Sequence, residues 1–73
     1  MMRLFTRQIC SDCQRLKAEG IPDGVVVIDC DGHEGLGDAA MEEVYEYPTL
    51  LMEDGSRFAG YGAIKEAFDE TVI

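Results

Sequence analysis

Two cysteines separated by two residues, Cys10 and Cys13, have the clearest chemical potential of any side chains in this sequence. Residues 4–6 are typical of a strand, and residues 13–19 are typical of a helix that ends at Gly20. A cysteine at a helix start lies near unpaired backbone N–H groups and the positive end of the helix dipole, and both favour the thiolate. Cys13, one turn further along, would lie close enough to displace a mixed disulfide. The pattern therefore predicts thiol–disulfide exchange.

A second chemistry uses the same cysteines as metal ligands. Cys10, Cys13, Cys30 and His33 form a CxxC…CxxH set whose spacing a structural zinc or iron–sulfur site would accept. The two pairs would also lie at the same end of two adjacent parallel strands. Cys30, however, ends a long β-branched run, and the rest of the chain has a sheet-and-helix pattern that needs no metal to explain it. We therefore expect Cys30 to be a small apolar core residue and expect no metal cofactor, with the metal site as the alternative.

Length and composition are those of a single small domain spanning residues 1–73. An apolar fraction of 47% is normal for a globular protein and argues against disorder. No stretch is long and apolar enough to span a membrane, and the N-terminal segment lacks the apolar core and cleavage site of a secretion signal. Three cysteines, an odd number, do not suit a secreted disulfide framework. We therefore expect a cytoplasmic protein.

The net charge is −9, and it is distributed unevenly along the chain. Residues 1–18 carry four basic side chains and a single acidic one, whereas residues 19–73 carry fourteen acidic and two basic ones. Nothing resembles the basic footprint of a nucleic-acid-binding protein, so we expect no nucleic-acid partner. The acidic residues either form an ordinary solvated surface, or the uneven charge places the cysteine segment in a locally positive field.

Strand-like and helix-like segments alternate in the order β-α-β-α-β-β-α. The expected elements are strands at residues 4–6, 25–30, 49–52 and 57–61, and helices at 13–19, from 37 or 38 to 46, and at 62–71. The run at 25–30 is typical of a strand buried on both faces. In the helix ending at 46, residues 40, 41, 44 and 45 would share the buried side. A parallel crossover followed by a hairpin predicts an α/β fold, with a four-stranded mixed sheet and helices on both faces.

Three segments resemble the thioredoxin superfamily and, within it, the small glutaredoxin-like redoxins. They are residues 5–13 (FTRQICSDC), 47–49 (YPT) and 58–61 (FAGY). The first is similar to the T-R-x-x-C-x-x-C segment of redoxins that serve ribonucleotide reductase, and the third is similar to their S-G-F segment. The second lies where the family has a cis-proline that faces the CxxC. The resemblance covers essentially the whole chain and implies a thioredoxin-like fold of the glutaredoxin type, with Cys10 as the attacking thiolate and Cys13 as the resolving thiol.

The sequence departs from this pattern at three places. Ser11-Asp12 replaces the Pro-Tyr common in glutaredoxins and the Gly-Pro of thioredoxins. Residues 60–63 lack the aspartate with which glutaredoxins hold the amino group of glutathione, and the Arg-Pro pair of the reductase-linked redoxins is missing after Tyr61. The resemblance carries over the fold and the thiol chemistry but not the identity of the electron donor and acceptor. The missing aspartate disfavours glutathione, and the T-R-x-x-C and FAGY segments favour the reductase-linked redoxins. We therefore expect a thioredoxin-reductase-type flavoenzyme as the electron donor and a disulfide-containing protein as the substrate.

Candidate substrate-binding residues flank the cysteines or lie in the other two matching segments: Arg7, Ser11, Asp12, Tyr47, Pro48, Gly60 and Tyr61. Arg7 favours a thiolate at Cys10, whereas Asp12 opposes it. A cis bond before Pro48 would leave the backbone of Tyr47 free to pair with an extended substrate, although a proline also commonly follows the end of a helix. Arg7 could equally be an ordinary surface arginine, and Tyr61 a half-buried aromatic at a strand end.

Three functions of different classes fit the sequence. The leading one is a monomeric dithiol–disulfide oxidoreductase that carries electrons to protein disulfides through a redox-active Cys10–Cys13 disulfide and binds neither nucleic acid nor membrane. The second is a zinc or iron–sulfur domain. The third is a redox-inactive thioredoxin-fold adaptor whose acidic surface binds a basic partner, and the intact CxxC argues against it.

Overall fold

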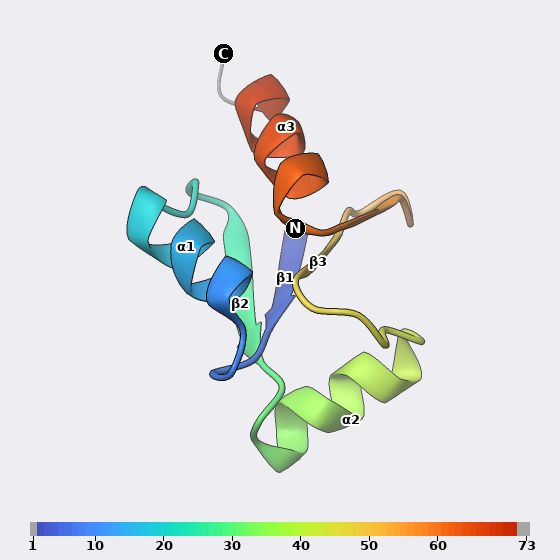
Figure 1. Cartoon of the computed structure of the whole chain (residues 1–73). Coiled ribbons are helices and arrows are strands. Elements are labelled where there is room, and N and C mark those ends of the chain that lie inside the picture. The colour runs from blue at the N-terminus through green and yellow to red at the C-terminus, as the bar shows by residue number, and fades with distance from the viewer. Residues whose placement is uncertain (1, 72–73) are drawn as a thin grey trace.

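Four strands and three helices follow one another in the predicted order. The computed structural model describes residues 2–71, and its elements are β1 (Met2–Thr6), α1 (Ser11–Glu19), β2 (Val25–Asp29), α2 (His33–Met41), β3 (Thr49–Leu51), β4 (Arg57–Ala59) and α3 (Tyr61–Thr71). The strands form one sheet in the order β2-β1-β3-β4, and Figure 1 shows β1 between β2 and β3. β1 is parallel to β2 and antiparallel to β3, and β3 and β4 form an antiparallel hairpin. The predicted α/β fold with a mixed sheet is confirmed.

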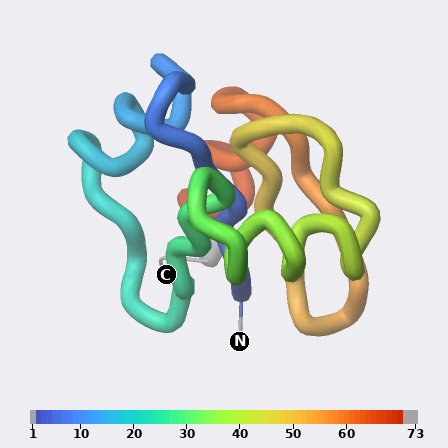
Figure 2. The backbone as a smooth tube through the Cα atoms, turned by 90° about the horizontal axis from the view of Figure 1, so that it is seen from below, coloured from blue at the N-terminus to red at the C-terminus, as the bar shows by residue number. Residues whose placement is uncertain are grey.

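Helices cover both faces of this sheet, as predicted. α1 and α3 lie on one face and α2 on the other, and α2 lies in front of the strands when the molecule is seen from below (Figures 1 and 2). Successive side chains of a strand point to opposite faces, so Leu4 packs under α1 and α3 while Phe5 packs towards α2. Both side chains are fully buried. No helix within residues 2–71 is long and apolar enough to cross a membrane.

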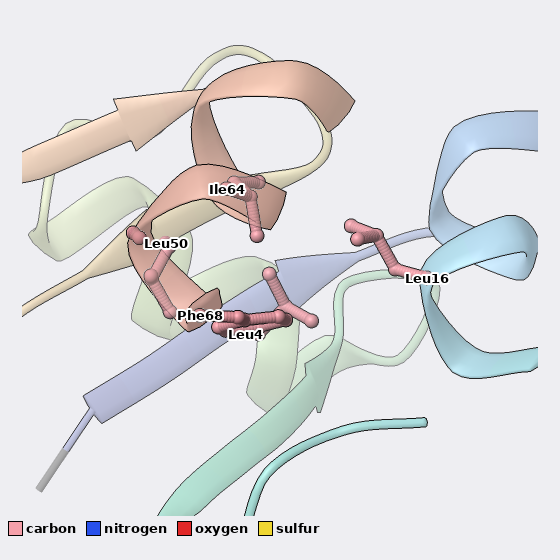
Figure 3. Packing of buried hydrophobic residues seen from close by; sticks show 6 residues of the cluster. Leu4, Leu16, Leu50, Ile64 and Phe68 are labelled. Atoms are coloured by element: carbon pink, nitrogen blue, oxygen red, sulfur yellow. The ribbon is translucent and has the colours of Figure 1, made fainter. Parts of the chain in front are cut away.

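The larger apolar cluster joins α1 and α3 to the sheet. Its buried members come from four elements and point towards one another (Figure 3): Leu4, Leu16, Leu50, Ile64, Ala67 and Phe68. Burying each large side chain of this kind contributes roughly 1.5–3 kcal/mol. The cluster therefore fixes α1, which begins next to the cysteine pair, against the central strand.

The strand β2 differs from its prediction. Its β-branched run was expected to be buried on both faces, but β2 is the edge strand beyond β1. Val26 and Val27 are 41% and 40% exposed, so each face of the strand is only partly covered. A continuous apolar run therefore marks a strand here without marking a central one.

The helix α2 begins and ends four or five residues earlier than predicted. After Met41 the chain turns back: Val44 N–H donates to Ala39 C=O at 2.8 Å, and Glu43 N–H donates to Ala40 C=O at 3.2 Å. This pair of bonds is the Schellman motif, which needs a left-handed residue, and Glu43 occupies that position with φ 58°. Because the residue is glutamate rather than glycine, the sequence does not signal the helix end. The expected buried side is wrong as well: Val44 is buried, but Met41 is 84% exposed.

The first turn of α2 approaches the end of β2 closely at Gly35. A Cβ atom added at Gly35 would lie 1.9 Å from the backbone oxygen of Asp29 and 2.7 Å from its carbonyl carbon. Gly35 is buried in the first turn of α2, directly against the end of β2. Only glycine allows the helix to pack this closely onto the strand.

We predict that Gly35→Ala destabilises the protein by about 1–3 kcal/mol, because the added methyl group must displace backbone rather than a flexible side chain. Gly37→Ala is the matched control, since Gly37 lies in the same helix, is exposed, and has nothing within 4 Å of the added Cβ. This control should stabilise the protein by about 0.5–1 kcal/mol through helix propensity. Urea denaturation of both variants measures the difference, and equal free energies of unfolding would show that the contact at Asp29 does not constrain α2.

Candidate redox site

Cys10 lies between β1 and α1 and caps the helix with its own side chain. Its backbone is extended, with φ −157°, and its Sγ accepts a hydrogen bond from Cys13 N–H at 3.2 Å. Its carbonyl oxygen accepts the bond from Gln14 N–H at 3.1 Å that begins the helical pattern. Serine, threonine, asparagine or aspartate is the usual residue at a helix N-cap. Because Cys10 takes this role here, α1 begins two residues earlier than predicted. A sulfur atom that receives an N–H bond at a helix start is stabilised as a thiolate.

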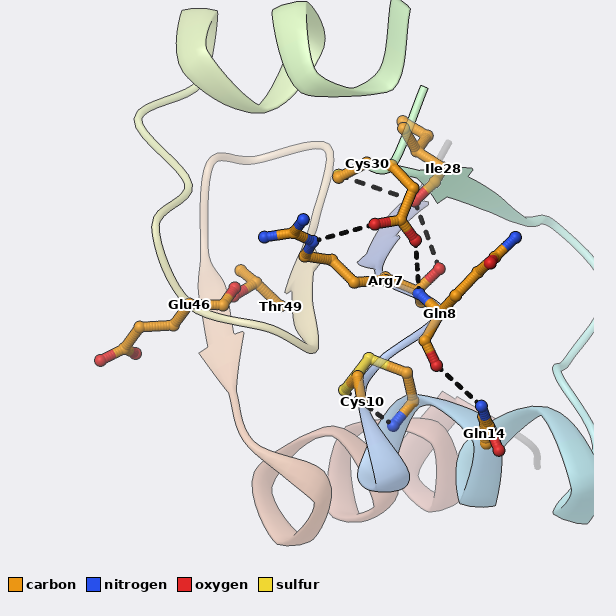
Figure 4. The surroundings of a disulfide bond; sticks show 11 residues. Arg7, Gln8, Cys10, Gln14, Ile28, Cys30, Glu46 and Thr49 are labelled. Carbon is orange, nitrogen blue, oxygen red and sulfur yellow. Dashed lines mark hydrogen bonds and ion pairs between the residues drawn. A yellow bond between two sulfur atoms is a disulfide. The ribbon is translucent and has the colours of Figure 1, made fainter. Parts of the chain in front are cut away.

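The two cysteines differ in their access to solvent. They are joined as a disulfide with Cα atoms 5.2 Å apart (Figure 4). Cys13 is fully buried on the inner side of α1, whereas Cys10 is half-buried at the surface. A sulfur atom from outside can therefore reach Cys10, and Cys13 can reach it only from inside.

An open depression of about 640 Å³ surrounds the exposed sulfur. Its lining residues come from the segment before α1, the first turn of α1 and the segment before β3: Arg7, Ile9, Cys10, Ser11, Asp12 and Tyr47. We call it the Cys10 pocket. Five of these six residues were predicted as site residues from the sequence. Ile9 was missed, although its 99% exposure beside Cys10 makes it the most prominent apolar side chain there. The signal for it was a β-branched residue immediately before the first cysteine.

Arg7 is held in place by a carboxylate that the sequence analysis also missed. Its Nε donates to Asp31 Oδ1 at 3.2 Å, and the other oxygen of Asp31 accepts the backbone N–H of Gln8 (Figure 4). The bond from Gln8 and then the bond from Arg7 lower the pKa of Asp31, so it is ionised at neutral pH. The Arg7 guanidinium carbon also lies 5.7 Å from the centre of the Tyr47 ring. The predicted parallel pairing was the signal for Asp31, because the ends of β1 and β2 meet at one edge of the sheet.

The bond between Tyr47 and Pro48 is cis, as the resemblance implies. The alternative reading, a proline that ends a helix, is wrong because α2 already ends at Met41. Pro48 is buried, and its carbonyl oxygen accepts Gly60 N–H at 3.0 Å. Gly60 is therefore hydrogen-bonded to Pro48, and neither residue lines the Cys10 pocket, whereas Tyr47 does.

Tyr61 is the first residue of α3, and its side chain contacts α1 outside the Cys10 pocket. Its hydroxyl donates to the carboxylate of Glu19 at the last turn of α1, and its ring centre lies 4.0 Å from the guanidinium carbon of Arg15. The hydrogen bond from Tyr61 lowers the pKa of Glu19 and raises that of Tyr61 itself. Lys65 adds an ion pair to the same carboxylate at 3.4 Å. These contacts tie α1 to α3.

Cys30 and His33 do not join the cysteine pair. Cys30 is 1% exposed, its thiol donates weakly to the Ile28 carbonyl at 3.8 Å, and burial raises its pKa. His33 begins α2 and lines a separate depression beside Asp29 and Gly35. Within the described part of the chain, no group of three or more histidine, cysteine or acidic side chains is placed to hold a metal ion. The prediction that Cys30 is a core residue is confirmed.

Comparison with known proteins adds one finding about the fold. No family model and no curated protein matches this chain. A crystal structure of the thioredoxin-like protein BC3987 is similar, with a TM-score of 0.60 and 19% sequence identity over 92% of this chain and 94% of that one. At this identity the likeness concerns the fold. This chain therefore has a thioredoxin-like fold, and its Cys10–Cys13 disulfide at the start of α1 fits a redox function.

Proposed function

We propose that this protein is a dithiol–disulfide oxidoreductase that carries electrons to protein disulfides. The observation that carries the proposal is the unequal placement of the two sulfurs. Cys10 lies at the surface with its Sγ on a helix N–H group, and Cys13 is fully buried directly behind it. Disulfide exchange needs two parts: a nucleophile that faces the substrate, and a protected thiol that reaches only the nucleophile.

The reaction balances over two exchanges. The thiolate of Cys10 attacks one sulfur of the substrate disulfide, forms a mixed disulfide and releases the other sulfur as a thiolate. Cys13 then loses its proton and attacks Cys10 Sγ, which forms the Cys10–Cys13 disulfide and releases the second substrate thiol. Two electrons pass to the substrate. The proton lost by Cys13 protonates one released sulfur, and the other released thiolate takes its proton from solvent.

The electron donor is proposed to be a thioredoxin-reductase-type flavoenzyme. Glutathione needs a fixed acidic group for its amino terminus, and the segment after Gly60 offers none, since residues 61–63 read Tyr-Gly-Ala. Arg7, the residue suited to a glutathione carboxylate, is already paired with Asp31. Both features disfavour glutathione as the electron donor. A flavoenzyme needs neither of them, because it reaches the Cys10–Cys13 disulfide through contacts between the two proteins.

The cysteine assignment predicts different failures of the two serine variants. Cys10→Ser should abolish disulfide reduction, because the remaining thiol at Cys13 is buried. Cys13→Ser should still attack but accumulate mixed disulfides, because nothing remains to resolve them. Mass spectrometry of each variant after exposure to a disulfide substrate detects reduction and mixed disulfides. Alkylation of the reduced protein by iodoacetamide over a pH series measures the reactivity of each thiol. Equal alkylation rates of the two thiols at neutral pH would contradict the assignment.

The donor is tested in a side-by-side NADPH-consumption assay against one disulfide substrate. Thioredoxin reductase should support faster turnover than glutathione with glutathione reductase. Faster turnover with glutathione would overturn the donor proposal but keep the oxidoreductase. Failure of both donors with a chemically reactive dithiol would require a different reductase.

Cys30 separates this function from the metal-binding alternative. Cys30→Ala should cost about 1 kcal/mol of stability, because it removes a buried sulfur from the cluster around Phe5 and Val44. Turnover per folded molecule should remain nearly unchanged. Metal analysis of protein purified under reducing conditions provides the decisive comparison. One equivalent of zinc, with unfolding when a chelator removes it, would establish the metal-binding function instead.

A further inference from the structure

The charged groups at the Cys10 pocket are not equally free to meet a ligand. Arg7 and Asp12 line the pocket, and Asp31 lies behind Arg7. Arg7 is the only cation in the lining. Asp12 is exposed and forms no ion pair with any other residue in the described part of the chain.

Asp31 is a firmly held partner for Arg7. One of its oxygens accepts Arg7 Nε at 3.2 Å and the other accepts Gln8 N–H, while its own backbone N–H donates to Asp29 Oδ1 at 3.0 Å. Its side chain is 29% exposed and that of Arg7 is 49% exposed. A ligand carboxylate would have to compete for Arg7 against a carboxylate that is already in place and bonded to the loop before Cys10.

A cationic ligand meets no such competition. Arg15, in α1, does not line the pocket; it pairs with Glu19 at 3.4 Å and lies over the Tyr61 ring. Asp12, beside Cys10, is then the uncompensated charge of the lining. The field of the whole chain has the same sign, because the net charge is −9.

We propose that Asp31 sets the charge selectivity of the Cys10 pocket by neutralising Arg7, so that the site takes disulfides flanked by cationic groups in preference to anionic ones. This inference rests on the proposed oxidoreductase function and names the class of its substrate. The natural partner is then a disulfide in a basic stretch of protein. Asp31 is a positioning residue, since it acts through Arg7 and touches neither sulfur.

Three small symmetrical disulfides of similar size provide the test: cystamine with two ammonium groups, bis(2-hydroxyethyl) disulfide with none, and 3,3′-dithiodipropionate with two carboxylates. Each oxidises the reduced protein by the two exchanges given above, releasing two thiols and leaving the Cys10–Cys13 disulfide. The second-order rate constant is measured in low salt by quenching with an alkylating agent and counting the remaining thiols by mass spectrometry. Dividing by the rate for the neutral disulfide removes any general effect of a variant on the dithiol.

The wild-type protein should react fastest with cystamine, more slowly with the neutral disulfide and slowest with dithiodipropionate. Asp31→Asn keeps the shape of the side chain but frees the charge of Arg7. It should raise the normalised rate of dithiodipropionate about three- to fivefold and lower that of cystamine, the size expected for one exposed charge interaction. In a double variant that also carries Arg7→Gln, this gain should disappear.

Asp69→Asn is the matched control. Asp69 is exposed near the end of α3, which contributes no residue to the lining of the Cys10 pocket, and its replacement removes the same net charge. The control should leave the normalised rates unchanged. If the normalised rates of Asp31→Asn equal those of the wild type, or change no more than those of Asp69→Asn, the inference is overturned and the oxidoreductase is left intact. A dithiol that none of the three disulfides oxidises would overturn the proposed function and this inference with it.

Discussion

The position of Cys10 depends on the burial of one strand. β1 is hydrogen-bonded on both sides, to β2 and β3, and both of its faces are covered, by Leu4 under α1 and α3 and by Phe5 under α2. A strand held in this way cannot slip by one residue without moving its apolar side chains to the opposite faces. The end of β1 at Thr6 is therefore fixed, and so is the short segment that leads to Cys10. Leu16 then fixes the helix on the other side of the cysteine pair.

Two sets of polar contacts complete this placement from the surface. At the far end of α1, Glu19 receives Tyr61 and Lys65 from α3. At the near end, Asp31 receives Arg7 and Gln8 from the loop before Cys10. Each set joins segments that are distant in the sequence, so together they hold the helix at both ends. Exposed ion pairs contribute little stability individually, and we assign these a role in orientation rather than in folding energy.

The strands could be predicted from the sequence because they depend on local patterns and on burial. The strands predicted at 4–6, 49–52 and 57–61 overlap β1, β3 and β4, although β1 begins at Met2 and β4 ends at Ala59, so that Tyr61 begins α3 instead of ending a strand. The errors have other physical causes. The exposure of β2 depends on its place in the sheet. The early end of α2 depends on a left-handed glutamate, and the close packing of its first turn on Asp29 depends on Gly35. The first is a tertiary property, and the other two depend on backbone geometry that residue types alone do not reveal.

The site shows the same division between local and tertiary information. The CxxC, its place at a helix start and the neighbouring Tyr47-Pro48 were all visible as motifs, because their chemistry depends on residue type and short spacing. Asp31 was not, because its importance arises only when parallel pairing brings the end of β2 beside Arg7. This distinction matters for charge. From the sequence, residues 1–18 are a basic segment in an acidic chain, whereas in the folded protein Arg3 pairs with Glu42, Arg7 with Asp31 and Arg15 with Glu19. Folding thus distributes the acidic excess over the basic segment, and the field near Cys10 is set by specific pairs rather than by the local composition.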